Sequence, residues 1–109
     1  MVMFLQRLGY EPTCVENGLE CLNEAMDRPY DLILTDIEMP EMSGAECTSE
    51  LRKAGVDAFI VAVTSSDTRA YSLSVGMNEY LAKPFDGMRL KNILQEAFHF
   101  QGINHAVVA

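Results

Sequence analysis

Apolar residues along this chain follow two patterns, short runs and spacings of three or four residues. The runs predict two strands, over residues 30–36 and 58–63, and we expect two further short strands over residues 11–16 and 79–83. The longer spacings predict helices before, between and after these strands, and a glycine or proline follows each of the first four: Gly9, Pro29, Gly55 and Gly76. A fifth helix is expected over residues 86–100.

Two helices indicate which face they bury. Asn17 can cap the second helix, with Glu20 three residues later, and the predicted buried stripe of this helix is Leu19, Leu22 and Met26. The fifth helix carries apolar residues at helical spacing, namely Leu90, Ile93, Leu94, Ala97 and Phe98.

The alternation of strands with helices predicts the fold class. Strands that read as continuous apolar runs, such as Leu32–Leu34, are typical of a sheet covered on both faces. We therefore predict an α/β fold, a doubly wound parallel sheet with helices on both faces. No repeat, low-complexity tract or linker divides residues 1–109, so we expect a single domain.

Three polar residues end predicted strands: Asp36, Thr64 and Lys83. Chemistry in parallel α/β sheets gathers at the carboxyl ends of the strands, so these side chains are expected to converge. A carboxylate can attack a phosphoryl group, provided that cations neutralise the phosphoryl oxygens. Asp36 would then be the nucleophile and a Mg²⁺ ligand, Lys83 the phosphoryl-binding cation, and Thr64 a hydrogen-bond donor. Each residue alone has an ordinary alternative as a cap or surface residue, and only the ordered combination favours phosphoryl transfer.

The amino-acid composition limits the binding partners and the cellular location that we expect for this protein. Sixteen acidic against eight basic residues give a net charge of -8, which argues against direct nucleic acid binding. No apolar run could span a bilayer, and the first residues lack a signal-peptide cleavage site. Cys14, Cys21 and Cys47 have no metal-type spacing and are odd in number, which favours reduced thiols and a cytoplasmic protein.

Three stretches resemble the response regulator receiver family of two-component signalling. Residues 30–44, YDLILTDIEMPEMSG, resemble its phosphoacceptor strand and loop. Residues 60–65, IVAVTS, are similar to its strand with the signalling hydroxyl, and residues 76–85, GMNEYLAKPF, to its Lys-Pro segment. The resemblance extends from the start of the chain to Phe98, and it implies a flavodoxin-like receiver fold.

The resemblance also implies a role for each matching residue. Asp36 would be the phosphoacceptor, Thr64 and Tyr80 the switch pair, and Lys83 the phosphoryl-binding lysine, with a cis bond to the following proline. Mg²⁺ would be bound by Asp36 and by the backbone carbonyl of Glu38. The implied partner is a histidine kinase or a histidine phosphotransfer protein, and the domain would be a signalling module rather than a turnover enzyme.

The match departs from the family at the first strand, which ends in an acidic pair that helps to hold Mg²⁺. This chain begins in the following helix, so we expect a receiver with its first strand missing or replaced, as in a truncated form, and with weakened Mg²⁺ binding. Residues 104–109, NHAVVA, form a short apolar stretch that could fill the vacant central slot, in the same molecule or in a homodimer. A frayed tail is the alternative that we favour slightly.

Two other functions remain open. A pseudo-receiver would bind partners without being phosphorylated, and the missing acidic pair is the feature in its favour. A phosphatase of the haloacid-dehalogenase type would use Asp36 and Glu38 as an Asp-x-Asp-like pair, but Glu38 replaces the second aspartate and the chain is short for that fold. Sustained turnover of a phosphate monoester would favour the phosphatase.

Overall fold

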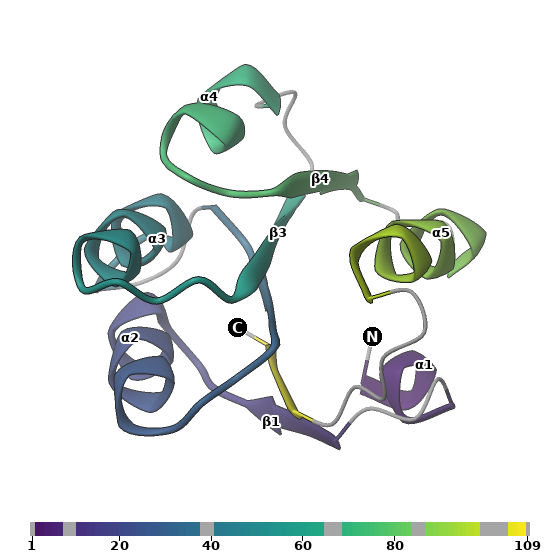
Figure 1. The fold of residues 1–109 in the computed structure, drawn as a ribbon, viewed down its shortest axis with the longest axis horizontal. Helices are drawn as coiled ribbons and strands as arrows, with labels where there is room; N and C mark the ends of the chain where they lie inside the picture. Colours follow the sequence, from purple (N-terminus) through teal and green to yellow (C-terminus); the bar gives the residue numbers. More distant parts are fainter. Residues whose placement is uncertain are drawn as a thin grey trace.

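The structure of the protein is a computed structural model that describes residues 2–7, 11–37, 41–64, 69–83, 87–98 and 105–108. Helices and strands alternate along these residues (Figure 1). Their bounds are α1 Val2–Arg7, β1 Glu11–Cys14, α2 Gly18–Asp27, β2 Leu32–Thr35, α3 Gly44–Lys53, β3 Phe59–Thr64, α4 Arg69–Ser74, β4 Glu79–Ala82, α5 Gly87–Phe98 and β5 His105–Val108. The predicted elements are therefore present, and the described bounds of the strands lie within two residues of the predicted ones.

The strands form one parallel sheet in the order β1-β5-β2-β3-β4. The predicted α/β fold with a parallel sheet is confirmed. The final strand lies between β1 and β2, where Val107 is level with Thr13 on one side and with Ile33 on the other. The frayed-tail interpretation is therefore wrong. The slot that we expected to be vacant is filled by the same chain, because an apolar run can pair with both neighbours and bury its side chains.

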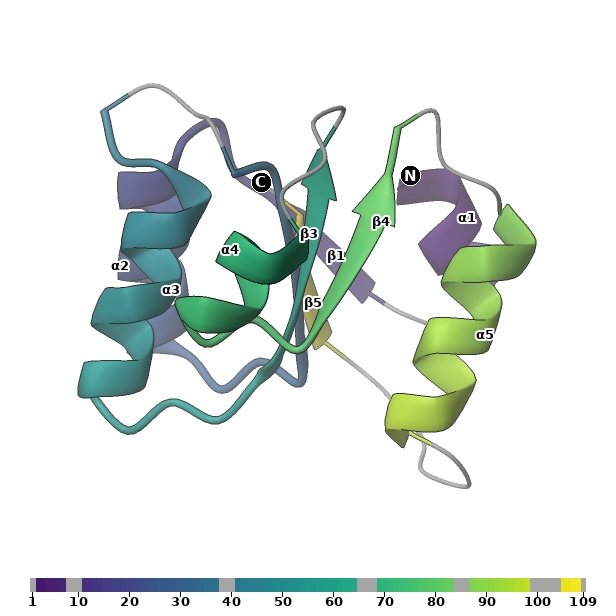
Figure 2. The same ribbon diagram turned by 90° about the horizontal axis from the view of Figure 1, so that it is seen from above.

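Helices cover both faces of the sheet (Figures 1 and 2). Helices α2 and α3 pack side by side on one face, and α1 and α5 lie on the other. Two clusters of buried residues follow from this arrangement, because successive strand residues point to opposite faces. Ile33 and Val107 belong to the cluster under α2 and α3, whereas Leu34 and Ala106 belong to the cluster under α1 and α5. The continuous apolar runs therefore supply both cores.

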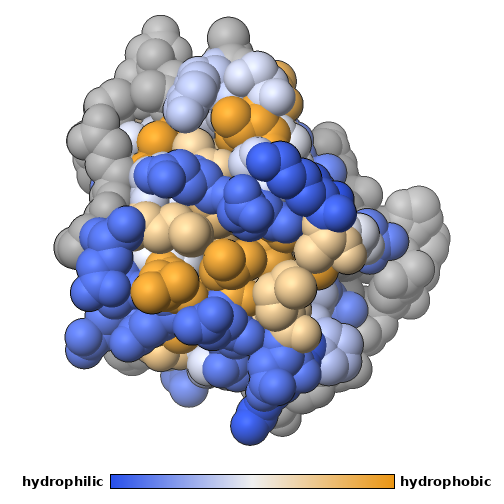
Figure 3. Space-filling model, turned by 90° about the vertical axis from the view of Figure 1, so that its left-hand side faces the viewer, coloured by the Kyte–Doolittle hydropathy of each residue, from blue (hydrophilic) through white to orange (hydrophobic). Residues whose placement is uncertain are grey.

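The buried face of α2 differs from the predicted one. Cys21 and Ala25 are buried, whereas Leu19 is 40% exposed and Met26 is 55% exposed. Leu22, the remaining member of the predicted stripe, is partly buried. Small residues face α3 because they allow the two helices to approach closely. The larger apolar residues turn outward, and the outer side of α2 and α3 shows apolar side chains between hydrophilic ones (Figure 3).

Helix α5 has the predicted buried face over its described side chains. Leu90, Ile93 and Leu94 are all buried in the cluster that also contains Leu5 of α1. The side chains of Ala97 and Phe98 lie outside the described residues. Helix α5 therefore packs on the sheet before the chain returns to form β5.

Candidate functional site

The site is built at the carboxyl edge of the sheet, where Asp36 follows β2 and Lys83 follows β4. The Lys83 ammonium donates to Asp36, with Nζ and Oδ2 2.6 Å apart. The Asp36 side chain is 28% exposed and that of Lys83 is 45% exposed, so both can be reached from solvent. The acid and the amine that the sequence places at two strand ends thus meet, although 47 residues separate them.

Thr64 ends β3, the strand between the two that carry this ion pair. Its backbone carbonyl accepts a hydrogen bond of 2.9 Å from the Lys83 amide, which sets the position of Lys83 relative to β3. The Thr64 side chain is buried. All three predicted residues therefore stand at adjacent strand ends, with the hydroxyl residue between the acid and the amine.

The backbone around Asp36 is fixed by the start of α3. The Gly44 amide donates to the carbonyl of Ile37 at 2.8 Å, and the Thr35 hydroxyl donates to the carbonyl of Asp36 at 3.0 Å. A Cβ atom on Gly44 would lie only 2.0 Å from the Asp36 carbonyl oxygen, so a side chain is excluded there. The sequence analysis named Gly44 only as part of a motif and did not predict this contact. The one signal that could have indicated it is the presence of a glycine just after the acidic loop.

Helix α3 itself begins with a capping box. The Ser43 hydroxyl accepts from the Glu46 amide at 3.0 Å, and the Glu46 carboxylate accepts from the Ser43 amide. Such reciprocal bonds satisfy two amides at the helix start. Ser43 and Glu46 therefore fix the first turn of α3, which also contains Gly44.

The remaining predicted site residues are placed only in part. Tyr80 lies on β4, half-buried against the core cluster under α2 and α3. Its position on the strand that leads to Lys83 fits a residue near the site, and its switch role stays a prediction. Glu38 lies outside the described residues, as does Pro84, so the predicted metal-binding carbonyl and the cis Lys-Pro bond lie outside them too.

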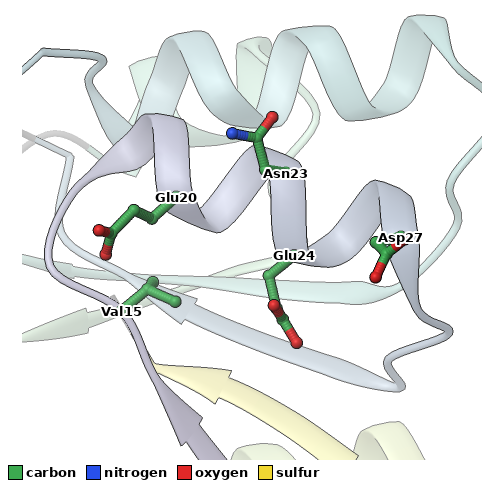
Figure 4. A pocket seen from close by; sticks show the side chains of 5 residues that line it. All are labelled: Val15, Glu20, Asn23, Glu24 and Asp27. Atoms are coloured by element: carbon green, nitrogen blue, oxygen red, sulfur yellow. The ribbon is translucent and has the colours of Figure 1, made fainter.

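A separate acidic groove runs along α2 beside the edge strand β1 (Figure 4). It is lined by Val15, Glu20, Asn23, Glu24 and Asp27. Two of its carboxylates are already engaged within the fold, because Glu20 accepts from the Glu16 amide at 2.8 Å and Glu24 accepts from the Tyr30 hydroxyl at 2.5 Å. Neither Asp36 nor Lys83 lines this groove, so it is not the site at the strand ends.

The part of the chain that the structure describes offers few ligands for Mg²⁺ beside Asp36. No group of three or more acidic, histidine or cysteine side chains there could hold a metal ion. The strand beside β2 is β5, and its sequence His-Ala-Val-Val carries no carboxylate. Asp36 is thus the one carboxylate that the described strand ends bring to the ion pair, which is the smaller number of the one or two carboxylates that commonly hold Mg²⁺.

Comparison with known proteins agrees with the resemblance to the response regulator receiver family. A family model described as the response regulator receiver domain matches residues 1–95. The hybrid signal transduction protein dokA of Dictyostelium discoideum is 36% identical over 99 residues, which are 88% of this chain and 6% of dokA. The chain spans less than half the length of this and other curated relatives.

Two solved structures resemble the fold over most of its length. The receiver domain of the sensor histidine kinase PA1611 from Pseudomonas aeruginosa, with magnesium in its active site cleft, is 37% identical and has a TM-score of 0.77, covering 86% of this chain and 81% of that one. The Ssk1 receiver domain of Saccharomyces cerevisiae, crystallised with the histidine phosphotransfer protein Ypd1, is 26% identical with a TM-score of 0.78, covering 92% and 83%. Among the described residues, we find no helix with the length and apolar character that are needed to cross a bilayer.

Proposed function

This chain belongs to the response regulator receiver family, and on that premise we propose that it is a phosphoacceptor domain switched by phosphorylation of Asp36. One observation carries the proposal: Lys83 Nζ lies 2.6 Å from Asp36 Oδ2 at the carboxyl edge of the sheet. A carboxylate next to a fixed cation at this edge suits phosphoryl transfer better than any other chemistry that these residues offer.

The proposed reaction transfers a phosphoryl group from a phosphohistidine to Asp36. A carboxylate oxygen of Asp36 attacks phosphorus, the bond between phosphorus and the imidazole nitrogen breaks, and an acyl phosphate forms. Lys83 then neutralises a phosphoryl oxygen, since its ammonium already lies beside the attacking group. Thr64 lies at the end of β3, between Asp36 and Lys83, and its hydroxyl moves toward the bound phosphoryl group. Tyr80 on β4 turns inward in response. The domain acts as a signalling module, and not as an enzyme that turns over a substrate.

We further propose that Mg²⁺ assists this transfer, as the magnesium-bound relative suggests, but that it binds this chain weakly. The reason is the donor set, because β5 contributes no carboxylate next to Asp36. Magnesium prefers oxygen ligands and is commonly held by one or two carboxylates and several waters. Titration calorimetry should therefore show weak binding, and tight stoichiometric binding would mean that a carboxylate from elsewhere completes the site.

The proposed phosphoryl donor is a histidine kinase or a histidine phosphotransfer protein, as the complex of a similar receiver with such a protein suggests. We expect the chain to act in the cytoplasm. Its net charge of -8 makes direct nucleic acid binding unfavourable. With the central slot filled by β5 of the same molecule, two copies would associate through the tail only by exchanging this strand.

Phosphorylation of Asp36 can be tested with a small acyl phosphate and Mg²⁺. We expect one phosphoryl adduct by intact mass, mapped to Asp36 after reduction with borohydride, and none in Asp36→Asn. Asp31→Asn is the matched control, because Asp31 is an exposed aspartate just before the same strand. The control should be phosphorylated as in the unmodified chain.

Two results would contradict the assignment. An adduct that persists in Asp36→Asn would place the phosphoryl group elsewhere. A folded protein that acquires no adduct from the acyl phosphate or from a phosphorylated histidine phosphotransfer protein would instead favour the pseudo-receiver.

A further inference from the structure

Helix α2 presents a row of apolar side chains to solvent. Leu19 is 40% exposed, Met26 is 55% exposed, and Leu22 is only partly buried. Residues spaced by three and four positions share one face of a helix, and we call these three residues the α2 stripe. On this side of the molecule, apolar side chains lie between hydrophilic ones (Figure 3). An exposed apolar row with a polar border is typical of a surface that binds another protein.

A row of carboxylates runs beside the α2 stripe. The residues of α2, GLECLNEAMD, include acids but no lysine or arginine. These acids, Glu20, Glu24 and Asp27, all line the acidic groove next to β1. Glu20 and Glu24 lie on the side of α2 toward Val15, as Figure 4 shows. At about 100° per residue, the acidic row and the α2 stripe occupy neighbouring strips along the same helix.

Two of these carboxylates are held in place by bonds within the fold. Glu20 accepts from the Glu16 amide at 2.8 Å, and Glu24 accepts from the Tyr30 hydroxyl. Arg28 Nε lies 3.7 Å from Glu24, but its side chain is 70% exposed, so this base neutralises the row only weakly. Side chains that are already ordered lose little conformational entropy when a partner binds. The negative charge of the row is therefore in position before binding.

We propose that the α2 stripe and the acidic row bind an amphipathic helix of another protein, one that carries a basic row beside its apolar row. The apolar side chains of that helix would pack between Leu19, Leu22 and Met26, as helices do when ridges enter grooves. Its lysine and arginine side chains would then meet the carboxylates of Glu20, Glu24 and Asp27, which fixes the direction of binding.

The charge of this surface decides between the partners that an apolar row could accept. A second copy of this chain does not fit, because two α2 helices face to face would bring like charges together, on chains that each have a net charge of -8. The surface includes neither Asp36 nor Lys83. The proposal is therefore independent of the proposed phosphorylation and can be tested on the unphosphorylated chain.

The test titrates the full chain into a fluorescently labelled synthetic peptide and follows the anisotropy. The peptide is a helix former of about 15 residues, with leucines at i, i+3 and i+7, lysines on the neighbouring strip and alanines elsewhere. We expect saturable binding that weakens when salt is raised from about 0.1 to about 1 M, because this shortens the Debye length from about 10 to about 3 Å. A peptide with glutamates in place of the lysines should not bind.

Variants of the protein assign the binding to α2. Leu19→Ala combined with Met26→Ala should weaken binding by about tenfold or more. Leu73→Ala combined with Met88→Ala is the matched control, because these residues are 43% and 61% exposed on α4 and α5, and this variant should bind like the unmodified chain. Asp27→Asn should weaken binding by roughly twofold to fivefold and reduce its dependence on salt. All of these positions are exposed, so circular dichroism should show folded proteins.

Three results would overturn the proposal. The first is that the lysine peptide does not bind the full chain. The second is that the variants on α2 and the control variant bind it equally, which would place the contact elsewhere. The third is that the glutamate peptide binds as tightly as the lysine peptide, or that salt leaves the affinity unchanged, because the acidic row would then not select the partner.

Discussion

Replacing Val107 with alanine tests whether β5 completes the sheet. Val107 is 0% exposed and lies between Thr13 of β1 and Ile33 of β2. The substitution removes two methyl groups, about 1.6 kcal/mol at roughly 0.8 kcal/mol per buried carbon. The cavity adds to this, so we expect a loss of about 2–3 kcal/mol in the free energy of unfolding. A domain of this size has roughly 5–15 kcal/mol in total.

Thermal unfolding followed by circular dichroism measures this loss. At roughly 4–8 °C for each kcal/mol, the melting temperature should fall by roughly 8–24 °C. Met26→Ala is the matched control, because Met26 is an apolar residue that is 55% exposed on α2. Substitutions at such surface positions usually change the free energy of unfolding by less than about 0.5 kcal/mol.

The comparison of the two variants decides the question. Equal melting temperatures for Val107→Ala and Met26→Ala would mean that the final strand is not buried in the sheet. Deletion of residues 103–109 is the harsher test, because it also removes the backbone hydrogen bonds of β5 to both neighbours. We expect that protein to unfold or to associate on a sizing column, and an unchanged monomer would refute the placement of β5.

Two further predictions concern the surroundings of the site and of the edge strand. Gly44→Ala should lower the melting temperature and slow phosphorylation by acyl phosphate, because the new Cβ would lie 2.0 Å from the Asp36 carbonyl oxygen. If the melting temperature and the phosphorylation rate are both unchanged, the backbone at Asp36 can move aside. Burial raises the pKa of Tyr30, and its hydrogen bond to Glu24 raises it further. Tyr30 therefore contributes stability that is fully present below its unfolded-state pKa of about 10, and this stability is lost as the pH rises through the folded-state pKa. Urea titrations at rising pH should show this loss, and Tyr30→Phe should reduce it.

The sequence predicted the central strands β2 and β3 because each is largely a continuous apolar run, which can be recognised without knowledge of its neighbours. Asp36, Thr64 and Lys83 could be placed at one edge for the same reason, since the carboxyl ends of parallel strands coincide. The buried face of α2 could not be predicted in this way. Apolar size favoured Leu19 and Met26, whereas close packing against α3 selects smaller residues.

Contacts that long side chains make across the fold could not be predicted from the sequence either. Arg52 donates to the carbonyls of Gly76 and Val56, at 3.0 and 2.9 Å, and to the side chain of Asn78 at 2.7 Å. A surface arginine at the end of a helix gives no local sign of such a set. Its partners are separated from it by up to 26 residues, and only the packing of α3 against the turn after α4 brings them within reach.

A central strand of this sheet could serve two purposes, pairing with its neighbours and binding a metal ion, and β5 is suited to the first. Pairing requires only backbone groups and apolar side chains, and β5 supplies both through Ala106, Val107 and Val108. Metal binding asks for carboxylates at the end of the strand, and His-Ala-Val-Val supplies none. A stable fold therefore says nothing about the strength of the metal site. Among the described residues Lys83 is the cation in direct contact with Asp36, so the proposed phosphorylation would bring its negative charge next to this ammonium.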